Sequence, residues 1–346
     1  MLSRSRPGLR GLPPLLLVGV LALTGALGVA QPAAQPRDVL KSHFIYVTGT
    51  ASLMPLIAQE QGFFKDGGLD VTLQRSTTGT EGVQALFGGS TDFTTTADAR
   101  VLQAISRDLP IVVVGINGYG FLGKFLVPAS DTKSRTMADL KGQPIVAQVG
   151  SGVHTVWTQY LETQGLSSGD FQVKNLPVPD MPAALQAGSA RGAIMWEPFA
   201  SRSVKQGLTR VLLTEPQIAG PVGSVYPFYL VTSRKVVQDK REVVQRLMNA
   251  WVRSAMWITE NPAKAKAFLG ETFAKGGRPL EPEVLGVVFE QQKYDAYTVD
   301  DRFVKDTGNV ARQLLKLGTL KAAPDFTKAV ENSFAEKALQ AARAAR

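Results

Sequence analysis

The sequence predicts an α/β protein of two lobes, each a mostly parallel sheet flanked by helices, with a helical C-terminal part. Short apolar runs alternate with helical patterns along most of the chain, which is typical of parallel sheets covered by helices on both faces. A polar segment at residues 128–142 separates two such stretches, and after Val236 the pattern is almost wholly helical. Without its first thirty residues the chain would hold 316 (346 − 30), which is enough for two lobes.

Residues 1–30 have the pattern of a signal peptide. A basic start with three arginines precedes an apolar run at residues 15–29, and Gly28-Val29-Ala30 supplies the small residues that favour cleavage after Ala30. The alternative is a retained membrane anchor, although the apolar run is shorter than the roughly 20 residues of a spanning helix. We expect export and a soluble chain in the periplasm or another extracytoplasmic space.

Residues 37–127 are predicted to form the first segment of the first lobe. Its strands are expected at residues 44–48, 69–74, 92–95, 111–116 and 120–127, and its helices at 53–61, 81–87 and 99–106. Ser52 is expected to cap the first helix, in which Pro55 is tolerated in the first turn. Pro128 stops the last of these strands, and we place the crossing to the other lobe in the polar segment that follows.

The second lobe is predicted at residues 128–225, with strands at 144–148, 171–176, 192–196 and 211–213 and helices at 153–161 and 181–187. Ser151 is expected to cap the first helix, whose apolar stripe includes Trp157 as a core residue. The chain is expected to return to the first lobe by a strand at 226–232, so that residues 226–346 complete that lobe. Breaks between the C-terminal helices, which should bury Trp251 and Trp257, are expected at Pro262, Gly276-Gly277, Pro282, Gly318 and Pro324.

Composition excludes several classes of function. The formal charge of +9 becomes +6 without the three N-terminal arginines, and the remaining charges are scattered, which argues against nucleic-acid binding. The chain has no cysteine, so it forms no disulfide, carries no cysteine nucleophile and lacks the cysteine of a lipoprotein anchor. With only His43 and His154, a histidine or cysteine metal cluster is excluded. We expect no cofactor and a monomer.

A glycine-rich segment at residues 118–123 fits G-x-G-x-x-G and most of a phosphate-binding loop. Both motifs require a strand, a loop and then a helix, but the residues after Gly123 are typical of a strand. Phe125 also stands where the phosphate-binding loop needs Ser or Thr. We therefore interpret this segment as a hairpin-like link.

Three strand-to-helix junctions in the first lobe carry hydroxyl or carboxylate side chains. These are Thr50 and Ser52, then Thr78-Gly79-Thr80, then Asp98. In a parallel sheet such junctions share the carboxyl edge, where helix N-termini attract polar ligands. Each side chain has a simpler alternative role as a helix cap or turn residue. Asp98 disfavours a bare anion such as nitrate, because an ionised carboxylate would repel it.

The residues resemble the nitrate/sulfonate/taurine-binding family of ABC-transporter substrate-binding proteins over roughly residues 43 to 335. The phrases that carry the resemblance are PLIAQEQGFFKDGGLDVTL, TGTEGVQALFGGSTDF, MADLKGQPIVAQVGSGVH, ALQAGSARGAIMWEPFA, WITENPAKAKAFL and DTGNVARQLLKLGTL. The resemblance implies a type II periplasmic-binding fold with two lobes and a hinge. It also implies delivery of a captured solute to a membrane permease with its ATPase.

Further candidate ligand-binding residues lie in the second lobe. Ser151, Gly152 and His154 open the amphipathic helix, and the resemblance places them at the cleft. His154 is off the apolar stripe, so the alternative is an exposed helix histidine. Trp196 and Glu197 match the family's acidic-proline lip, where Trp196 could stack on a ligand and Glu197 could accept a hydrogen bond. The alternative is a turn of structural use only.

We interpret the chain as a binding protein, not an enzyme, that captures a small polar or zwitterionic solute. A sulfonate or taurine-like, nitrate-like or heterocyclic compound would fit. One alternative is a ligand-sensing partner of a membrane receptor. Another is an enzyme similar to those that make the pyrimidine of thiamine, which use histidine and a cysteine cluster that this chain lacks.

Overall fold

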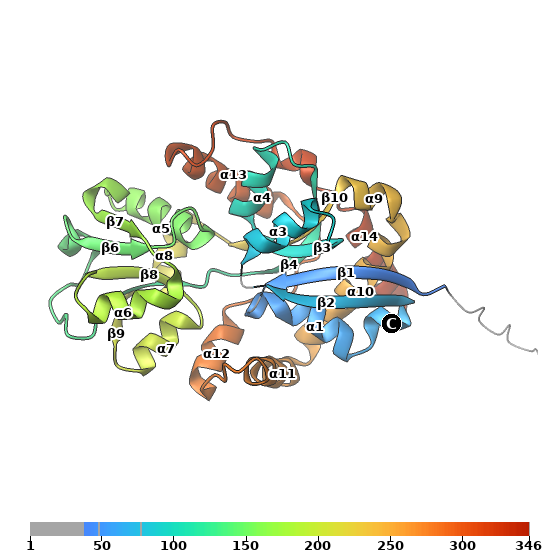
Figure 1. Ribbon diagram of the computed structural model, residues 1–346, viewed down its shortest axis with the longest axis horizontal. Coiled ribbons are helices and arrows are strands. Elements are labelled where there is room, and N and C mark those ends of the chain that lie inside the picture. The colour runs from blue at the N-terminus through green and yellow to red at the C-terminus, as the bar shows by residue number, and fades with distance from the viewer. Residues whose placement is uncertain (1–37, 48, 77, 346) are drawn as a thin grey trace, which may run out of the picture. The chain divides into compact units, whose positions relative to one another are not determined.

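The computed structural model describes residues 38–47, 49–76 and 78–345 (Figure 1). The predicted signal peptide lies outside the described residues. Residues 38–346 group into one compact unit. None of the helices in the described part is both long and apolar enough to cross a membrane.

Two five-stranded sheets form the centre of this unit. The first has the order β2 (Leu69–Ser76), β1 (Leu40–Val47), β3 (Phe93–Ala97), β10 (Pro227–Ser233), β4 (Ile111–Tyr119). The second has the order β7 (Gln172–Asn175), β6 (Pro144–Ala147), β8 (Gly192–Trp196), β5 (Gly123–Pro128), β9 (Thr209–Leu213). In each sheet one strand runs against its two neighbours, β10 in the first and β5 in the second. The sheets are therefore mixed but mostly parallel, as predicted.

Helices cover both faces of each sheet (Figure 1). Those before the return strand are α1 (Leu53–Glu60), α2 (Phe63–Asp66), α3 (Gly79–Phe87), α4 (Asp98–Ile105), α5 (Gly152–Thr163), α6 (Met181–Gln186), α7 (Phe199–Lys205) and α8 (Glu215–Val222). Those after it are α9 (Arg234–Asp239), α10 (Arg241–Glu260), α11 (Pro262–Lys275), α12 (Pro282–Glu290), α13 (Asp301–Lys316) and α14 (Ser333–Ala344). One face of the first sheet packs on α1, α10 and α14 and the other on α3, α4 and α13.

The predicted first crossing is wrong in position. Residues 120–127 were assigned to the first lobe, but β5 pairs with β8 and β9 of the second sheet. The chain therefore changes sheet at residues 120–122, immediately after β4, and the glycine-rich segment is an inter-sheet crossing instead of a hairpin. An apolar strand pattern reports burial but not which sheet accepts the strand.

The C-terminal helices end where proline and glycine predicted, but two breaks were missed, at Lys240 between α9 and α10 and after α12. Helix α11 begins at Pro262 and ends before Gly276, α12 begins at Pro282, and α13 ends two residues before Gly318. Between α12 and α13 the chain is extended, although it contains neither proline nor glycine there. Lys293 pairs with Tyr119 at the end of β4 through two backbone hydrogen bonds of 3.0 and 2.8 Å. Tertiary pairing therefore overrides the local helical pattern.

Large aromatic side chains fix the helices on the sheets. Trp251 of α10 is buried, stacks on Phe44 with ring centroids 5.4 Å apart, and donates its indole N–H to the carbonyl of Ile116 at 3.0 Å. Trp157 of α5 stacks on Phe125 at 5.7 Å in the second sheet. Trp157 and Trp251 are thus core residues as predicted, while Trp257 is only partly buried against the core.

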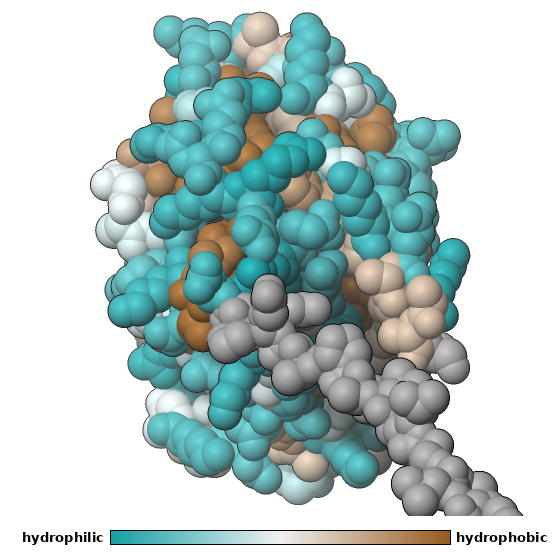
Figure 2. Space-filling model, turned by 90° about the vertical axis from the view of Figure 1, so that its right-hand side faces the viewer, coloured by the Kyte–Doolittle hydropathy of each residue, from teal (hydrophilic) through white to brown (hydrophobic). Residues whose placement is uncertain are grey.

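The outer surface is mainly polar at one end of the molecule. Figure 2 shows hydrophilic side chains over most of that face, with hydrophobic ones in small separate groups. The large hydrophobic side chains that stand exposed in the described residues are Val39, Val149 and Leu315. Val149 lies in the loop between β6 and α5.

Helix α3 lies unusually close to β3 because glycines face the strand. A Cβ atom added at Gly79 would lie 2.4 Å from Thr96 Oγ1, and one added at Gly82 would lie 2.0 Å from Thr94 Oγ1 and 3.0 Å from Thr94 Cβ. Any larger residue at these positions would push the helix away from the sheet. The glycines therefore set the position of the loop that precedes α3.

We expect Gly82→Ala to destabilise the protein by about 1–3 kcal/mol through overpacking, although alanine is the better helix former by about 1 kcal/mol. The matched control is Gly286→Ala in α12, where the nearest atom to an added Cβ is the flexible Glu290 carboxylate at 3.9 Å. Urea unfolding measures both changes. If Gly82→Ala were as well tolerated as Gly286→Ala, α3 would not depend on this close approach.

Candidate functional site

The carboxyl edges of the two sheets face each other. Strands β1, β3 and β4 are parallel, and β4 ends at Tyr119, only three residues before β5 begins in the other sheet. Since β5 is antiparallel to β8, its first residue Gly123 pairs with the last residue of β8, Trp196. The ends of β1, β3, β6 and β8 therefore meet across this crossing, as Figure 1 shows.

The first two junctions of the first sheet lie on this edge, but the hydroxyls of Ser52 and Thr78 there already have hydrogen-bond partners. Ser52 does not cap α1 as predicted; its hydroxyl donates to the Gly49 carbonyl at 2.6 Å. The side chain of Thr50, in the short turn Thr50–Ser52, lies outside the described residues. Thr78 caps α3 by accepting from the Glu81 N–H at 3.3 Å.

Thr80 differs from the side chains around it. It follows Gly79 in the first turn of α3 and is partly exposed. Its hydroxyl makes no hydrogen bond with any described residue. Among the described hydroxyls of Ser52, Thr78 and Thr80, that of Thr80 is therefore the one that remains available to a ligand.

Asp98 is the first residue of α4, and Ala97 is the N-cap. Its side chain is fully buried; one carboxyl oxygen accepts from the Ala99 N–H at 2.6 Å and the other has no partner among the described residues. Burial, together with the nearby Asp306 carboxylate, raises the pKa of Asp98 well above its usual range. The raised pKa weakens the repulsion of a bare anion that was expected from an ionised Asp98.

The start of α5 is capped by Ser151 and contacted by the return crossing. Ser151 accepts from the His154 N–H at 3.2 Å, and the ring of Tyr226 lies against Gly152. Gly152 is required here, because an added Cβ would lie 2.7 Å from the Tyr226 hydroxyl. Tyr226 belongs to the return crossing and has a left-handed backbone with φ of 49°. The Ser151 side chain remains partly exposed beside it.

His154 is a buried residue, contrary to the alternative of an exposed helix histidine. Its ring lies 5.9 Å from the ring of Trp157, and only 3 % of its surface is exposed. Burial lowers the pKa of His154 to about 4, so the imidazole is neutral at neutral pH. It can offer a hydrogen bond but not a charge.

Glu197 is held inside the second lobe and Trp196 is partly exposed beside it. One Glu197 oxygen lies 2.6 Å from Lys124 Nζ and accepts from the Ser201 hydroxyl at 2.7 Å, and the other accepts from the Ser201 N–H at 3.0 Å. Glu215 lies 3.1 Å from the same ammonium. Burial alone would lower the pKa of Lys124, but Glu197 and Glu215 hold it above its usual value. The Glu197 carboxylate is therefore part of a structural ion-pair network.

Sequence reasoning missed four residues at or near these edges. Tyr226 and Lys124 supply the contacts just described, Val149 presents an apolar side chain that is 47 % exposed, and Arg100 is a partly exposed cation in the first turn of α4. Arg100 and Val149 stand two residues from sites that had been recognised, Asp98 and Ser151. Their proximity to a predicted junction was the available signal.

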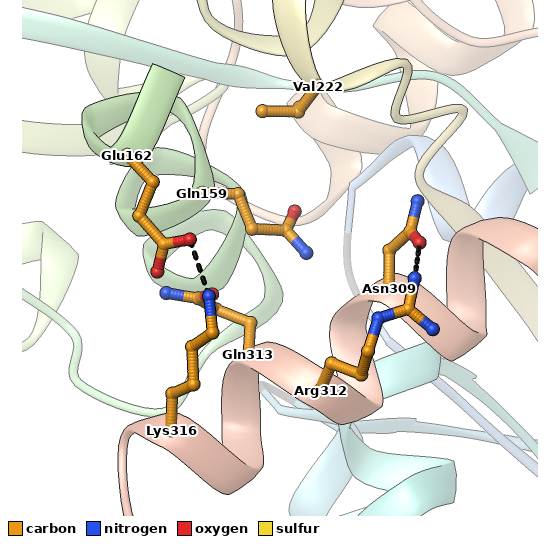
Figure 3. Close-up of a pocket in the computed structure, with 7 residues that line it drawn as sticks. All are labelled: Gln159, Glu162, Val222, Asn309, Arg312, Gln313 and Lys316. Carbon is orange, nitrogen blue, oxygen red and sulfur yellow. Dashed lines mark hydrogen bonds and ion pairs between the residues drawn. The ribbon is translucent and has the colours of Figure 1, made fainter. Parts of the chain in front are cut away.

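A separate cavity of about 230 Å³ lies between α5, α8 and α13 (Figure 3). Its charged groups have partners: Lys316 pairs with Glu162 at 2.7 Å, and Arg312 donates to Asn309. None of the predicted site residues lines it. Across the described residues, no group of three or more His, Cys, Asp or Glu side chains could hold a metal ion.

Residues 50–265, more than half of the chain, match the family model described as NMT1/THI5 like. An aliphatic sulfonates-binding protein of Escherichia coli (strain K12) is 31 % identical over 39 % of this chain and 42 % of its own length. An aliphatic sulfonates-binding protein of Bacillus subtilis (strain 168) is 22 % identical over 94 % of this chain and 96 % of its own length.

Solved structures share the fold. The periplasmic aliphatic sulphonate binding protein from Escherichia coli has a TM-score of 0.72 and 19 % identity, covering 84 % of this chain and 92 % of that protein. A desulfurization enzyme also matches, with a TM-score of 0.64, 15 % identity and coverage of 86 % and 99 %. The bilobed fold is thereby established, and it occurs in binding proteins and in an enzyme.

We expect His154 to make the protein less stable in acid. The unfolded state takes up a proton near the usual histidine pKa of about 6.5, whereas the folded state does so only near 4, so stability is full above pH 6.5 and falls between these values. From pH 7.5 to 5.0 the loss is about 2 kcal/mol. Urea unfolding should show this loss in the wild type but not in His154→Gln. The exposed His43→Gln is the control, and coincident pH profiles for wild type and His154→Gln would refute the assignment.

Proposed function

The chain belongs to the NMT1/THI5-like family, and from this premise we propose that it is the extracytoplasmic solute-binding protein of an ABC importer. One observation carries the proposal: the starts of α1, α3, α4, α5 and α7 all lie on two carboxyl edges that face each other. A solute between these edges would be approached from both sheets. Relatives named as sulfonate-binding proteins, one of which matches over almost its whole length, support the same function.

We propose an organic sulfonate, or a solute of similar charge and size, as the ligand. Helix starts favour anions because their unpaired N–H groups carry partial positive charge. The partly exposed hydroxyls of Thr80 and Ser151 can donate to sulfonate oxygens. Burial and the nearby Asp306 raise the pKa of Asp98 well above its usual range, which weakens its repulsion of such a group.

The apolar part of the ligand would lie against the second lobe. Trp196 ends β8 at the facing edge and is partly exposed, and Val149 stands exposed in the loop before α5. Glu197 then has an indirect role, because its ion pair with Lys124 fixes the loop that follows Trp196. Glu197 and His154 are assigned positioning roles in this proposal.

The proposed partners are a membrane permease and its ATPase. The two crossings at residues 120–122 and 223–226 would act as the hinge, and the permease would recognise the closed form. Export by the N-terminal segment and a monomeric state complete the proposal. The relatives that are named as binding proteins favour transport over catalysis on this fold.

Calorimetric titration of protein freed of bound solute tests the ligand class. The panel is butanesulfonate, ethanesulfonate, taurine, nitrate and a pyrimidine. We expect a sulfonate to bind most tightly, near micromolar affinity, which corresponds to about 8 kcal/mol. Failure of the whole panel to bind, or preference for the pyrimidine, would contradict the proposed ligand.

Two substitutions test the site itself. We expect Thr80→Val to weaken binding of the best sulfonate about tenfold or more, since one hydrogen bond to a charged group is lost. Trp196→Leu should weaken binding of butanesulfonate more than that of ethanesulfonate, because it removes contact with the chain. Thr272→Val in α11, whose hydroxyl bonds only its own helix at Phe268, is the matched control. Equal affinities for Thr80→Val and Thr272→Val would remove Thr80 from the site.

A further inference from the structure

A groove between α3 and α4 lies on the outer layer of the first lobe. It has a volume of about 340 Å³. Its lining includes Thr80 at one end, the apolar side chains of Val83, Phe87 and Leu109, and two cations, Arg100 and Arg107. We refer to it as the α3–α4 groove.

Positive charge in the α3–α4 groove is not balanced. No carboxylate lines it, and neither arginine forms an ion pair with any described residue. Burial lowers the pKa of Arg100, Tyr226 raises it, and the charge of Arg107 lowers it by a smaller amount. In the cavity of Figure 3, by contrast, Lys316 is paired with Glu162. The partly buried Arg100 and the exposed Arg107 therefore repel each other, and a bound anion would relieve this repulsion.

Apolar surface lies next to these charges. Val83, Phe87 and Leu109 are partly buried and pack against the core beneath α3 and α4. Their aliphatic and aromatic atoms remain accessible to a bound molecule. An inorganic anion would pair with the arginines but leave this apolar surface in contact with water, whereas a molecule with an apolar part would cover it.

Arg100 is oriented by a contact that reaches the other sheet. Its guanidinium donates to the Gln103 side-chain oxygen at 2.6 Å, and the Gln103 amide donates to the Gly150 carbonyl at 3.4 Å. Gly150 precedes α5 in the second lobe. A ligand on Arg100 would thus touch a residue that already bridges the two lobes.

We propose that the α3–α4 groove is a second binding site, for a small organic anion whose carboxylate or sulfonate head pairs with Arg100 and Arg107 and whose short apolar chain covers Val83, Phe87 and Leu109. The guanidinium fork suits such a head because it donates two parallel hydrogen bonds. This site goes beyond the proposed transport function. It shares Thr80 with the proposed sulfonate site, whereas Arg107 is assigned to the groove alone.

Titration with sodium hexanoate tests the groove, with 1-hexanol as the neutral analogue. We expect hexanoate to bind and hexanol to bind at least tenfold more weakly. Arg107→Gln should weaken hexanoate binding about tenfold, the loss expected for one charge-assisted hydrogen bond, and Arg107→Lys by less. The exposed Arg343→Gln on α14 removes the same charge elsewhere and should leave binding unchanged.

Trp196→Leu separates the groove from the site between the sheets. Hexanoate should bind this variant as it binds the wild type, and Arg107→Gln should leave the affinity for the best sulfonate unchanged. The proposal is overturned if hexanol binds as well as hexanoate, if Arg107→Gln and Arg343→Gln behave alike, or if Trp196→Leu abolishes hexanoate binding. Failure here leaves the sulfonate titration intact as a separate result.

Discussion

The three-residue crossing between β4 and β5 is the constraint on which the rest of the structure depends. Because β4 ends at Tyr119 and β5 begins at Gly123, the chain has no room to turn either sheet around, so the carboxyl edges must face each other. A Cβ atom added at Gly120 would lie 1.9 Å from the Gln291 carbonyl oxygen, and the backbone φ there is 140°. Only glycine meets both conditions. The position of every junction at the candidate site therefore depends on this crossing.

The protein pairs several polar groups on these edges by itself. The Ser52 hydroxyl donates to Gly49, Ser151 caps α5, and Glu197 forms an ion pair with Lys124. Buried polar groups that lack partners are costly, so this internal pairing stabilises the free protein. A small set of partly exposed groups remains open to a solute. They are hydroxyls on one side and apolar surface on the other.

The sequence predicted the junctions better than it predicted the roles of their side chains. Strand-to-helix transitions are local, and hydrophobic periodicity together with capping residues locates them within a few positions. The sheet to which β5 belongs is decided by pairing with residues 67 or more positions away (193 − 126 = 67 for Leu126 and Ala193). The partner of Glu197 is likewise 73 residues distant at Lys124. The alternative of an exposed His154 is wrong, because a helix between a sheet and a neighbouring lobe is buried beyond its apolar stripe. No local pattern reports such contacts.

The return crossing shows how tightly the two lobes are coupled. One oxygen of the buried Asp306 carboxylate on α13 accepts from the Ser224 hydroxyl at 3.2 Å and from the backbone N–H groups of Val225 and Tyr226 at 2.9 and 3.0 Å. These bonds fix the backbone whose side chain, Tyr226, reaches the start of α5. The segment after α12 lies along the other crossing, where the Gln292 amide donates to the Gly120 carbonyl at 2.9 Å. Any rotation of one sheet against the other must therefore bend the chain at Gly118, Gly120 and Gly223, the glycines beside these anchored residues, and must carry Tyr226 with it. A solute that binds between the edges would then act first at the start of α5, where Tyr226 of the return crossing packs against Gly152 of the second lobe.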